Sequence, residues 1–124
     1  MKIISFHLAL LIIRLGFSIG LITHGYVKFL KVIQGDFKFS EPLGIGSAPS
    51  LILTSFGEFI APIFIIIGYK TRFFSFFPTI TMSVAFLIAH AGDPFSRKEK
   101  SFVYLIAFLA LCFSGPGKYS LDKE

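Results

Sequence analysis

Hydrophobic residues occur along this chain in long runs that short polar segments separate. Each run is close to the roughly 20 residues that a helix needs to cross the hydrocarbon core of a bilayer. We predict helices over residues 3–29, 50–69, 73–91 and 94–114. After the last run, Gly115–Pro116–Gly117 is a sequence that stops helices. The pattern therefore predicts an all-α fold, an integral membrane four-helix bundle that forms one domain over residues 1–124.

The start of the fourth helix is open between two capping arrangements. Asp93 can cap the helix, with Pro94 at its first position, because these residue types favour those places. Alternatively, Ser96 and Glu99 form a capping box that starts the helix three residues later. Both arrangements give a helix that ends near Ser114.

The one substantial loop, residues 31–49, joins the first two predicted helices. It mixes four large apolar side chains with glycines: Phe37, Phe39, Leu43 and Ile45 with Gly35, Gly44 and Gly46. Large apolar residues are unusual in a solvated linker, and they suit a segment at the membrane surface. We predict an interfacial or partly re-entrant loop.

Composition supports a membrane protein. Of the 124 residues, 54% are hydrophobic and only 15% are charged, against roughly 25% charged residues in an average soluble domain. The mean hydropathy is +0.78. The net charge of +5 comes from basic residues beside the ends of the apolar runs, where membrane anchoring accounts for them. The lipid bilayer is therefore the expected partner, and nucleic acid is not.

The cysteine and histidine residues do not have the number or spacing that a disulfide or a metal site requires. Cys112 is the single cysteine, so a disulfide framework and a cysteine zinc site are excluded. His7, His24 and His90 are too far apart for local ligand spacing. We expect no metal.

Two charged residues lie inside the apolar runs. Glu58 stands in SFGEFIAPIFIIIG, where an unpaired carboxylate is costly. Counting about 1.5 Å per residue, Glu58 lies about 12 Å below a surface at Ser50, and Arg14 lies about 15 Å below the same surface if the first helix leaves the membrane near His24. The depths agree, so we predict an Arg14–Glu58 pair inside the bundle. Such a pair can bind a ligand or simply hold helices together.

A ring of polar residues is predicted at the mouth on the side of the long loop. We select Arg14, His24, Lys28, Glu58, His90 and Glu99 as the candidate polar pocket. Histidine and carboxylate groups can bond the carbonyl oxygens of a quinone-like head group and exchange protons with it. In the alternative reading, His24 is an ordinary interfacial residue and His90 only caps the third helix.

Five sequence features resemble the DoxX family, in order along nearly the whole chain. They are Arg14-Leu15-Gly16, His24-Gly25-Tyr26-Val27-Lys28, Gly57-Glu58 before an apolar run to Gly68, Thr71-Arg72 and the terminal GPGKYSLD of residues 115–122. The terminal motif is the most specific of them. The resemblance implies a multi-pass protein of the bacterial inner membrane with four helices and both termini in the cytoplasm. The family is named for membrane subunits of a thiosulfate:quinone oxidoreductase.

Two classes of function follow. The first is a membrane component of a quinone-linked oxidoreductase system, which takes electrons from a redox partner subunit because this chain has no flavin, haem or iron–sulfur motif of its own. Quinone is then the one expected ligand, with no intrinsic cofactor. The second is a non-enzymatic membrane scaffold or small carrier in which the buried charges are structural. A homo-oligomer is compatible with both.

Overall fold

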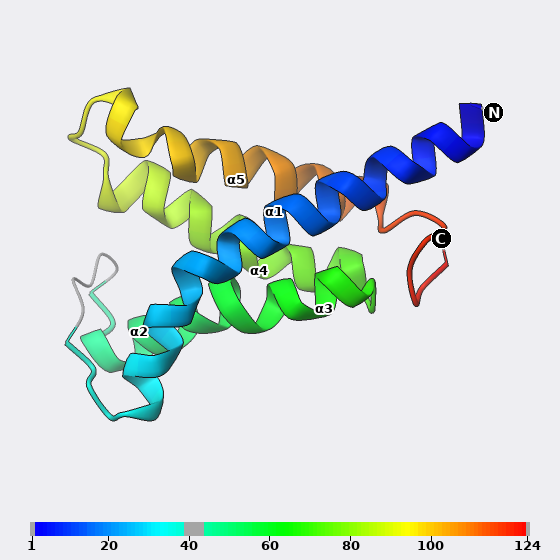
Figure 1. Ribbon diagram of the computed structural model, residues 1–124. Coiled ribbons are helices and arrows are strands. Elements are labelled where there is room, and N and C mark those ends of the chain that lie inside the picture. Colours follow the sequence, from blue (N-terminus) through cyan, green and yellow to red (C-terminus); the bar gives the residue numbers. More distant parts are fainter. Residues whose placement is uncertain (1, 39–43, 124) are drawn as a thin grey trace.

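The computed structural model describes residues 2–38 and 44–123, and every regular element in these ranges is a helix. The elements are α1 (Lys2–Ile33), α2 (Ser47–Ser55), η1 (Phe56–Ile60), α3 (Ala61–Ile67), α4 (Thr71–Val84), η2 (Ala85–Ala89) and α5 (Phe95–Ser114). The two η elements are π-helical segments. Because α2, η1 and α3 follow one another without a break, as do α4 and η2, the chain forms four rods (Figure 1).

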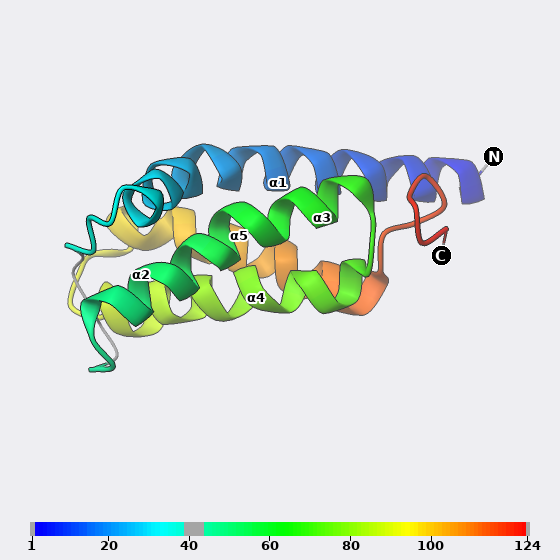
Figure 2. The ribbon, with the colours of Figure 1, turned by 90° about the horizontal axis from the view of Figure 1, so that it is seen from below.

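The four rods form a bundle, which confirms the predicted all-α fold. α1 packs against the α2–η1–α3 rod and against α5, and α4 also packs against both of these neighbours (Figure 2). The first described residues of α1 and the end of the chain lie at the same end of the bundle (Figure 1). We call this end the terminal end, and the other end, where α2 and α5 begin, the loop end.

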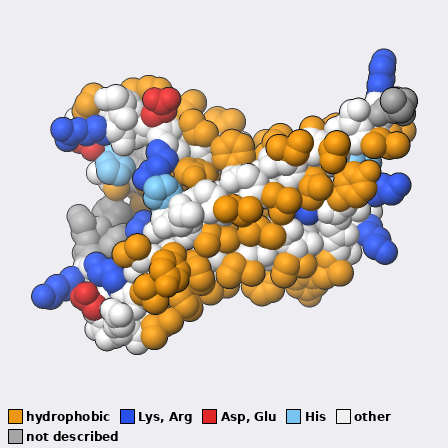
Figure 3. Space-filling view, viewed as in Figure 1, with side chains coloured by type: hydrophobic (Ala, Val, Ile, Leu, Met, Phe, Trp, Pro, Cys, Tyr) orange, Lys and Arg blue, Asp and Glu red, His pale blue; other side chains and the backbone are white. Residues whose placement is uncertain are grey.

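Within the described ranges, three rods are long and apolar enough to cross a membrane: Lys2–Ile33, Ser47–Ile67 and Thr71–Ala89. α5 is not among them, because its first two turns carry Arg97, Lys98, Glu99 and Lys100 and its apolar part begins only at Ser101. Figure 3 shows hydrophobic side chains over the middle of the molecule and charged ones gathered at its two ends. A bundle with apolar residues on its outer surface is suited to lipid.

The start of α5 differs from both predictions. The helix begins after Pro94, and no side chain caps its first turn. The Asp93 carboxylate instead lies 2.9 Å from Nδ1 of His90, so neither the Asp93 cap nor the Ser96–Glu99 capping box forms. The rules for helix capping consider only the backbone N–H groups of the helix, whereas Asp93 pairs with the His90 ring three residues earlier.

The predicted interfacial loop falls partly outside the described residues, since residues 39–43 are not among them. They include Phe39 and Leu43. Of the remaining loop, α1 extends to Ile33, four residues beyond its predicted end, and α2 begins at Ser47, three residues before its predicted start. The position of this loop in the membrane stays a prediction.

The core joins all four rods. Leu21, Ile65, Met82, Phe108 and Leu111 are buried and pack together. This cluster fixes the rods relative to one another in the middle of the bundle. Polar residues can therefore gather at the loop end without supplying the main packing contacts there.

Both π-helical segments lie toward the loop end. In η1, Pro62 has no backbone N–H for the carbonyl of Glu58 four residues earlier, and the Ala61 N–H bonds the carbonyl of Phe56, five residues back. In η2, the His90 N–H bonds the carbonyl of Ala85, again five residues back. Single π turns are frequent at functional sites because they alter the direction of nearby side chains.

Candidate functional site

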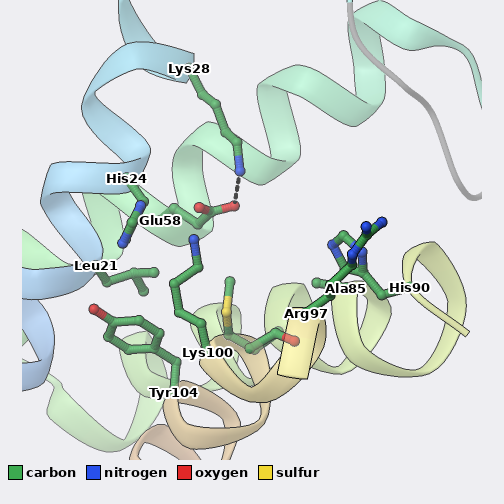
Figure 4. Close-up of a pocket in the computed structure, with 11 residues that line it drawn as sticks. Leu21, His24, Lys28, Glu58, Ala85, His90, Arg97, Lys100 and Tyr104 are labelled. Carbon is green, nitrogen blue, oxygen red and sulfur yellow. Dashed lines mark hydrogen bonds and ion pairs between the residues drawn. The ribbon is translucent and has the colours of Figure 1, made fainter. Parts of the chain in front are cut away.

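A cavity of about 350 Å³ opens at the loop end between α1, η1, α4–η2 and α5. It is lined by Leu21, His24, Lys28, Glu58, Met82, Ala85, His90, Arg97, Lys100, Ser101 and Tyr104. Figure 4 shows these side chains converging from all four rods. Pockets of about 300–1,000 Å³ are the usual size for small-molecule ligands, so this cavity can hold one.

Glu58 reaches the cavity from η1 and pairs with Lys28 of α1. The Nζ atom of Lys28 lies 2.7 Å from a carboxylate oxygen of Glu58. The Glu58 side chain is 4% exposed and that of Lys28 is 31% exposed, so the carboxylate is in the interior while the ammonium borders on water. The predicted burial of Glu58 is confirmed, and the ion pair with Lys28 compensates the carboxylate charge there.

Gly25 allows this approach between α1 and η1. A Cβ atom at Gly25 would collide with the backbone carbonyl of Glu58. Lys28 follows Gly25 by three residues, and it is therefore placed on the side of α1 that meets η1. The close helix contact and the ion pair depend on the same glycine.

The two histidines lie on different sides of the cavity. His24 comes from α1, with its ring edge-on to Tyr104 at 6.2 Å between centroids. His90 follows η2, and its Nδ1 is engaged by Asp93, which leaves its Nε2 atom for another partner. Within the described residues, no hydrogen bond to the His24 ring is present. Both rings thus retain nitrogen atoms that can exchange a proton with a ligand.

α5 contributes two cations that the sequence analysis did not select. Arg97 and Lys100 line the cavity, and the side chain of neither has a hydrogen-bond or ion-pair partner among the described residues. In Figure 4, the ammonium group of Lys100 points toward Glu58 and His24. With Lys28, the lining holds three cations against the single carboxylate of Glu58. The cavity therefore favours a ligand with electron-rich oxygen atoms.

The predicted Arg14–Glu58 pair is wrong. Arg14 is 2% exposed, but it lies toward the terminal end, where it donates to the carbonyl oxygens of Pro116 at 2.6 Å, Tyr119 at 2.7 Å and Ile66 at 3.4 Å. α1 meets Glu58 at Gly25 and not at Arg14. Gly25 lies eleven positions after Arg14, which corresponds to about 16 Å along the helix.

Arg14 belongs to a lock that holds the C-terminal segment, residues 115–122, against the bundle. His7, two turns before Arg14 on α1, accepts the backbone N–H of Lys118 at Nδ1, at 2.9 Å. The Asp122 carboxylate accepts the backbone N–H groups of Lys70 and Thr71, each at 2.9 Å. These bonds join α1, the end of α3 and the start of α4, which indicates a structural role for Arg14.

Glu99 does not line the cavity either. It borders a shallower opening beside it, formed by Phe17, Ser96, Glu99, Lys100, Val103 and Tyr104. Of the six candidate residues, the structure thus brings His24, Lys28, Glu58 and His90 together and leaves out Arg14 and Glu99. A ligand in the cavity stays a prediction.

The residues that sequence reasoning missed share one helical face. Arg97, Lys100, Ser101 and Tyr104 follow the spacing of three, four and seven residues that places side chains on one side of a helix. The signal was present in the sequence. It was obscured because charged residues at the start of an apolar helix are also typical of membrane anchoring.

Comparison with known proteins supplies the family. Residues 9–91 match the model of the DoxX family, about two thirds of the chain. This protein belongs to the DoxX family. The match runs from within α1 to just past η2 and therefore includes Lys28, Glu58 and His90, whereas the whole of α5 and the C-terminal segment of residues 115–122 lie beyond it.

One relative aligns with this chain over most of the length of both proteins. An uncharacterized protein of Haemophilus influenzae is 29% identical over 121 residues, which cover 90% of this chain and 87% of the relative. No solved structure matches. The function of this DoxX protein is therefore inferred from its own cavity.

Proposed function

We propose that this DoxX family protein is a membrane component of a quinone-linked oxidoreductase system, and that the cavity at the loop end binds the quinone head group. The observation that carries the proposal is the gathering of His24, Glu58 and His90 around one cavity at the loop end. Titratable groups at membrane depth are costly and usually functional.

The cavity offers suitable partners for both quinone carbonyl oxygens. The side chains of Lys100 and Arg97 are donors without partners among the described residues. A cation that donates to a carbonyl oxygen stabilises the negative charge that forms there on reduction. His24 and His90 can then supply protons. Reduction of a quinone takes two electrons and two protons and yields the quinol.

The electrons come from outside the chain in this proposal. A redox partner subunit delivers them, and this chain contributes the binding site and the proton-exchanging groups. We place the protein in the bacterial inner membrane with both termini in the cytoplasm, so that the cavity belongs to the opposite half of the bilayer. A homo-oligomer is compatible with this arrangement.

Quinone binding by purified protein tests the proposal. In nanodiscs, wild-type protein is expected to bind a naphthoquinone without a tail, measured by calorimetry. Lys100→Met removes a charged donor in the cavity and should weaken binding at least about tenfold, since such hydrogen bonds contribute about 1.5–3 kcal/mol. Lys118→Met is the matched control, because this exposed lysine lies at the terminal end.

Two results would contradict the proposal. The first is wild-type protein that neither binds the naphthoquinone nor retains a quinone on purification. The second is equal weakening by Lys100→Met and Lys118→Met. Either result would favour a non-enzymatic scaffold or carrier. The hydrogen bonds of Arg14 to the C-terminal segment agree with that alternative, because they give this buried charge a structural role.

A further inference from the structure

Four buried polar atoms in the terminal half of the bundle have no hydrogen-bond partner among the described residues. They are Nε of Arg14 and the hydroxyl oxygens of Ser18, Thr71 and Ser75. All four residues are at most 2% exposed. Because buried polar groups in folded proteins are nearly always hydrogen-bonded, this cluster indicates a partner that is not a protein group.

The hydroxyl groups of Thr71 and Ser75 differ from the other hydroxyl groups of α4. Those of Thr79, Thr81 and Ser83 each donate to the backbone carbonyl four residues earlier, the usual local bond of these residues inside a helix. The Ser75 hydroxyl makes no such bond. It is therefore available to a partner in the interior of the bundle.

The four atoms come from the inward faces of two helices. The buried residues of each helix follow one stripe: Leu10, Arg14, Ser18, Leu21 and Gly25 in α1, and Thr71, Ser75, Pro78 and Met82 in α4. Both helices run from the terminal end to the loop end (Figure 1), and Leu21 and Met82 belong to the core cluster. Arg14 and Ser75 each precede those core residues by seven positions, which is about 10 Å along a helix. The two stripes therefore present their polar groups at a similar depth, between the core and the C-terminal lock.

The guanidinium group of Arg14 is a buried charge without a carboxylate partner. It donates to three backbone carbonyl oxygens, and among the described residues no acidic side chain forms an ion pair with it. A charge at membrane depth ordinarily has a partner of opposite charge. The unpartnered groups around Arg14 are hydroxyls, which can all donate. An anion satisfies these donors and the charge together, whereas a water molecule satisfies only the donors.

We propose that a monatomic anion of the size of chloride binds between α1 and α4, held by the Nε–H of Arg14 and the hydroxyl groups of Ser18 and Ser75. This site is distinct from the cavity at the loop end and independent of the proposed function. The anion neutralises Arg14 and thereby stabilises the C-terminal lock that Arg14 holds.

Thr71 connects this site to the surface at the terminal end. Besides its unpartnered hydroxyl, Thr71 lines an opening of about 380 Å³ together with Lys70, Arg72, Phe73 and Asp122. The Asp122 carboxylate is engaged there by the backbone N–H groups of Lys70 and Thr71. An anion can approach through this opening, past the cations Lys70 and Arg72.

Thermal unfolding in detergent micelles tests the site, with chloride as the probe. Sodium chloride and sodium gluconate are compared at equal ionic strength, so that charge screening is the same and only the smaller anion fits. Wild-type protein should unfold at a temperature at least about 5 °C higher in chloride, because a ligand that binds only the folded state stabilises it. The dependence of this shift on chloride concentration gives an apparent Kd.

A serine variant and its matched control locate the site. Ser75→Ala should raise the apparent Kd for chloride at least about tenfold, since it removes a hydrogen bond to a charged group. In gluconate, Ser75→Ala should be at least as stable as wild type, because a buried hydroxyl without a partner is lost. Ser83→Ala is the control on the same helix. The Ser83 hydroxyl donates to the Thr79 carbonyl, so this variant should bind chloride as wild type does.

Crystals grown with bromide in place of chloride give the position of the ion. The anomalous scattering of bromide should produce a peak within hydrogen-bonding distance of Nε of Arg14. A peak beside Lys100 and Arg97, with none beside Arg14, would assign the anion to the cavity at the loop end and overturn the inference.

Two results of the unfolding experiment would also overturn it. Equal unfolding temperatures of wild type in chloride and gluconate would leave water as the partner of the four buried groups. An equal apparent Kd for Ser75→Ala and Ser83→Ala would exclude Ser75 from an anion site. Both results leave the proposed binding of quinone untouched, since that is measured at the other end of the bundle.

Discussion

Lys28 and Glu58 form an ion pair at 2.7 Å that links α1 to the π-helical segment η1. The carboxylate is buried and the ammonium is partly exposed. The two partners therefore differ in what their removal leaves behind, since a buried carboxylate without a partner is costlier than a lysine that can reach water.

We expect Lys28→Met to lower the free energy of unfolding by about 1–3 kcal/mol, the range for a buried polar group that loses its partner. Glu58→Gln should cost less, because Lys28 borders on water. The double change should also cost less than Lys28→Met alone. Unfolding in mixed detergent micelles measures all three. A double variant less stable than Lys28→Met would contradict a pairing role for the two charges.

A substitution at Gly25 tests the close contact between α1 and η1. Gly25→Ala places a Cβ atom against the Glu58 carbonyl and should destabilise the bundle by about 1–3 kcal/mol through overpacking. Gly16 is the matched control on the same helix, because a Cβ atom there meets nothing within 4 Å. Gly16→Ala should be neutral or stabilising by up to about 1 kcal/mol, since alanine favours helix. Equal effects of the two changes would show that α1 can shift away from η1 at little cost.

Arg14 should hold the C-terminal segment in place. Arg14→Gln removes the charged donor from the carbonyls of Pro116 and Tyr119, and we expect hydrogen exchange of the amides in residues 117–121 to accelerate at least about tenfold. Arg97→Gln, at the loop end, should leave those amides unchanged. Protection that persists in Arg14→Gln would show that His7 and Asp122 suffice to hold the segment.

Asp122 should stabilise the start of α4. Its carboxylate accepts the N–H groups of Lys70 and Thr71, as the side chain of a capping residue does from within its own helix. Asp122→Ala should cost about 0.5–2 kcal/mol in the free energy of unfolding. Asp36→Ala serves as the control, because among the described residues its carboxylate accepts only the N–H of Lys38, in the exposed segment after α1. Equal stability of the two variants would contradict the capping role.

The sequence predicted the helices well because apolar runs of membrane length permit few alternatives. It failed on the partner of Glu58 for a geometric reason. The depths of Arg14 and Glu58 were counted from a membrane surface assumed to lie at His24 and Ser50, whereas α1 meets Glu58 at Gly25, beside that assumed surface. Each misplaced residue shifts the count by about 1.5 Å. The partner itself was among the candidates, since Lys28 was assigned to the mouth.

Three other features depend on tertiary packing, which local sequence rules do not describe. The π turn that contains Glu58 follows from Pro62 together with the packing of Gly25, and neither residue alone specifies it. The Asp93–His90 contact replaced a helix cap because a tertiary partner competed with a local one. Arg97 and Lys100 resembled ordinary anchoring charges until the fold directed one face of α5 into the cavity.

The C-terminal lock also has a consequence for biosynthesis. Arg14 belongs to α1, whereas two of its three carbonyl acceptors, Pro116 and Tyr119, follow it by 102 and 105 residues. An arginine in the middle of a membrane helix costs about 2.5–3.5 kcal/mol on insertion scales. Because Pro116 and Tyr119 are synthesised after α1, α1 must enter the bilayer before the charge of Arg14 is fully compensated. A chain that stops before Pro116 therefore carries Arg14 in a membrane helix with only the Ile66 carbonyl left of its three acceptors.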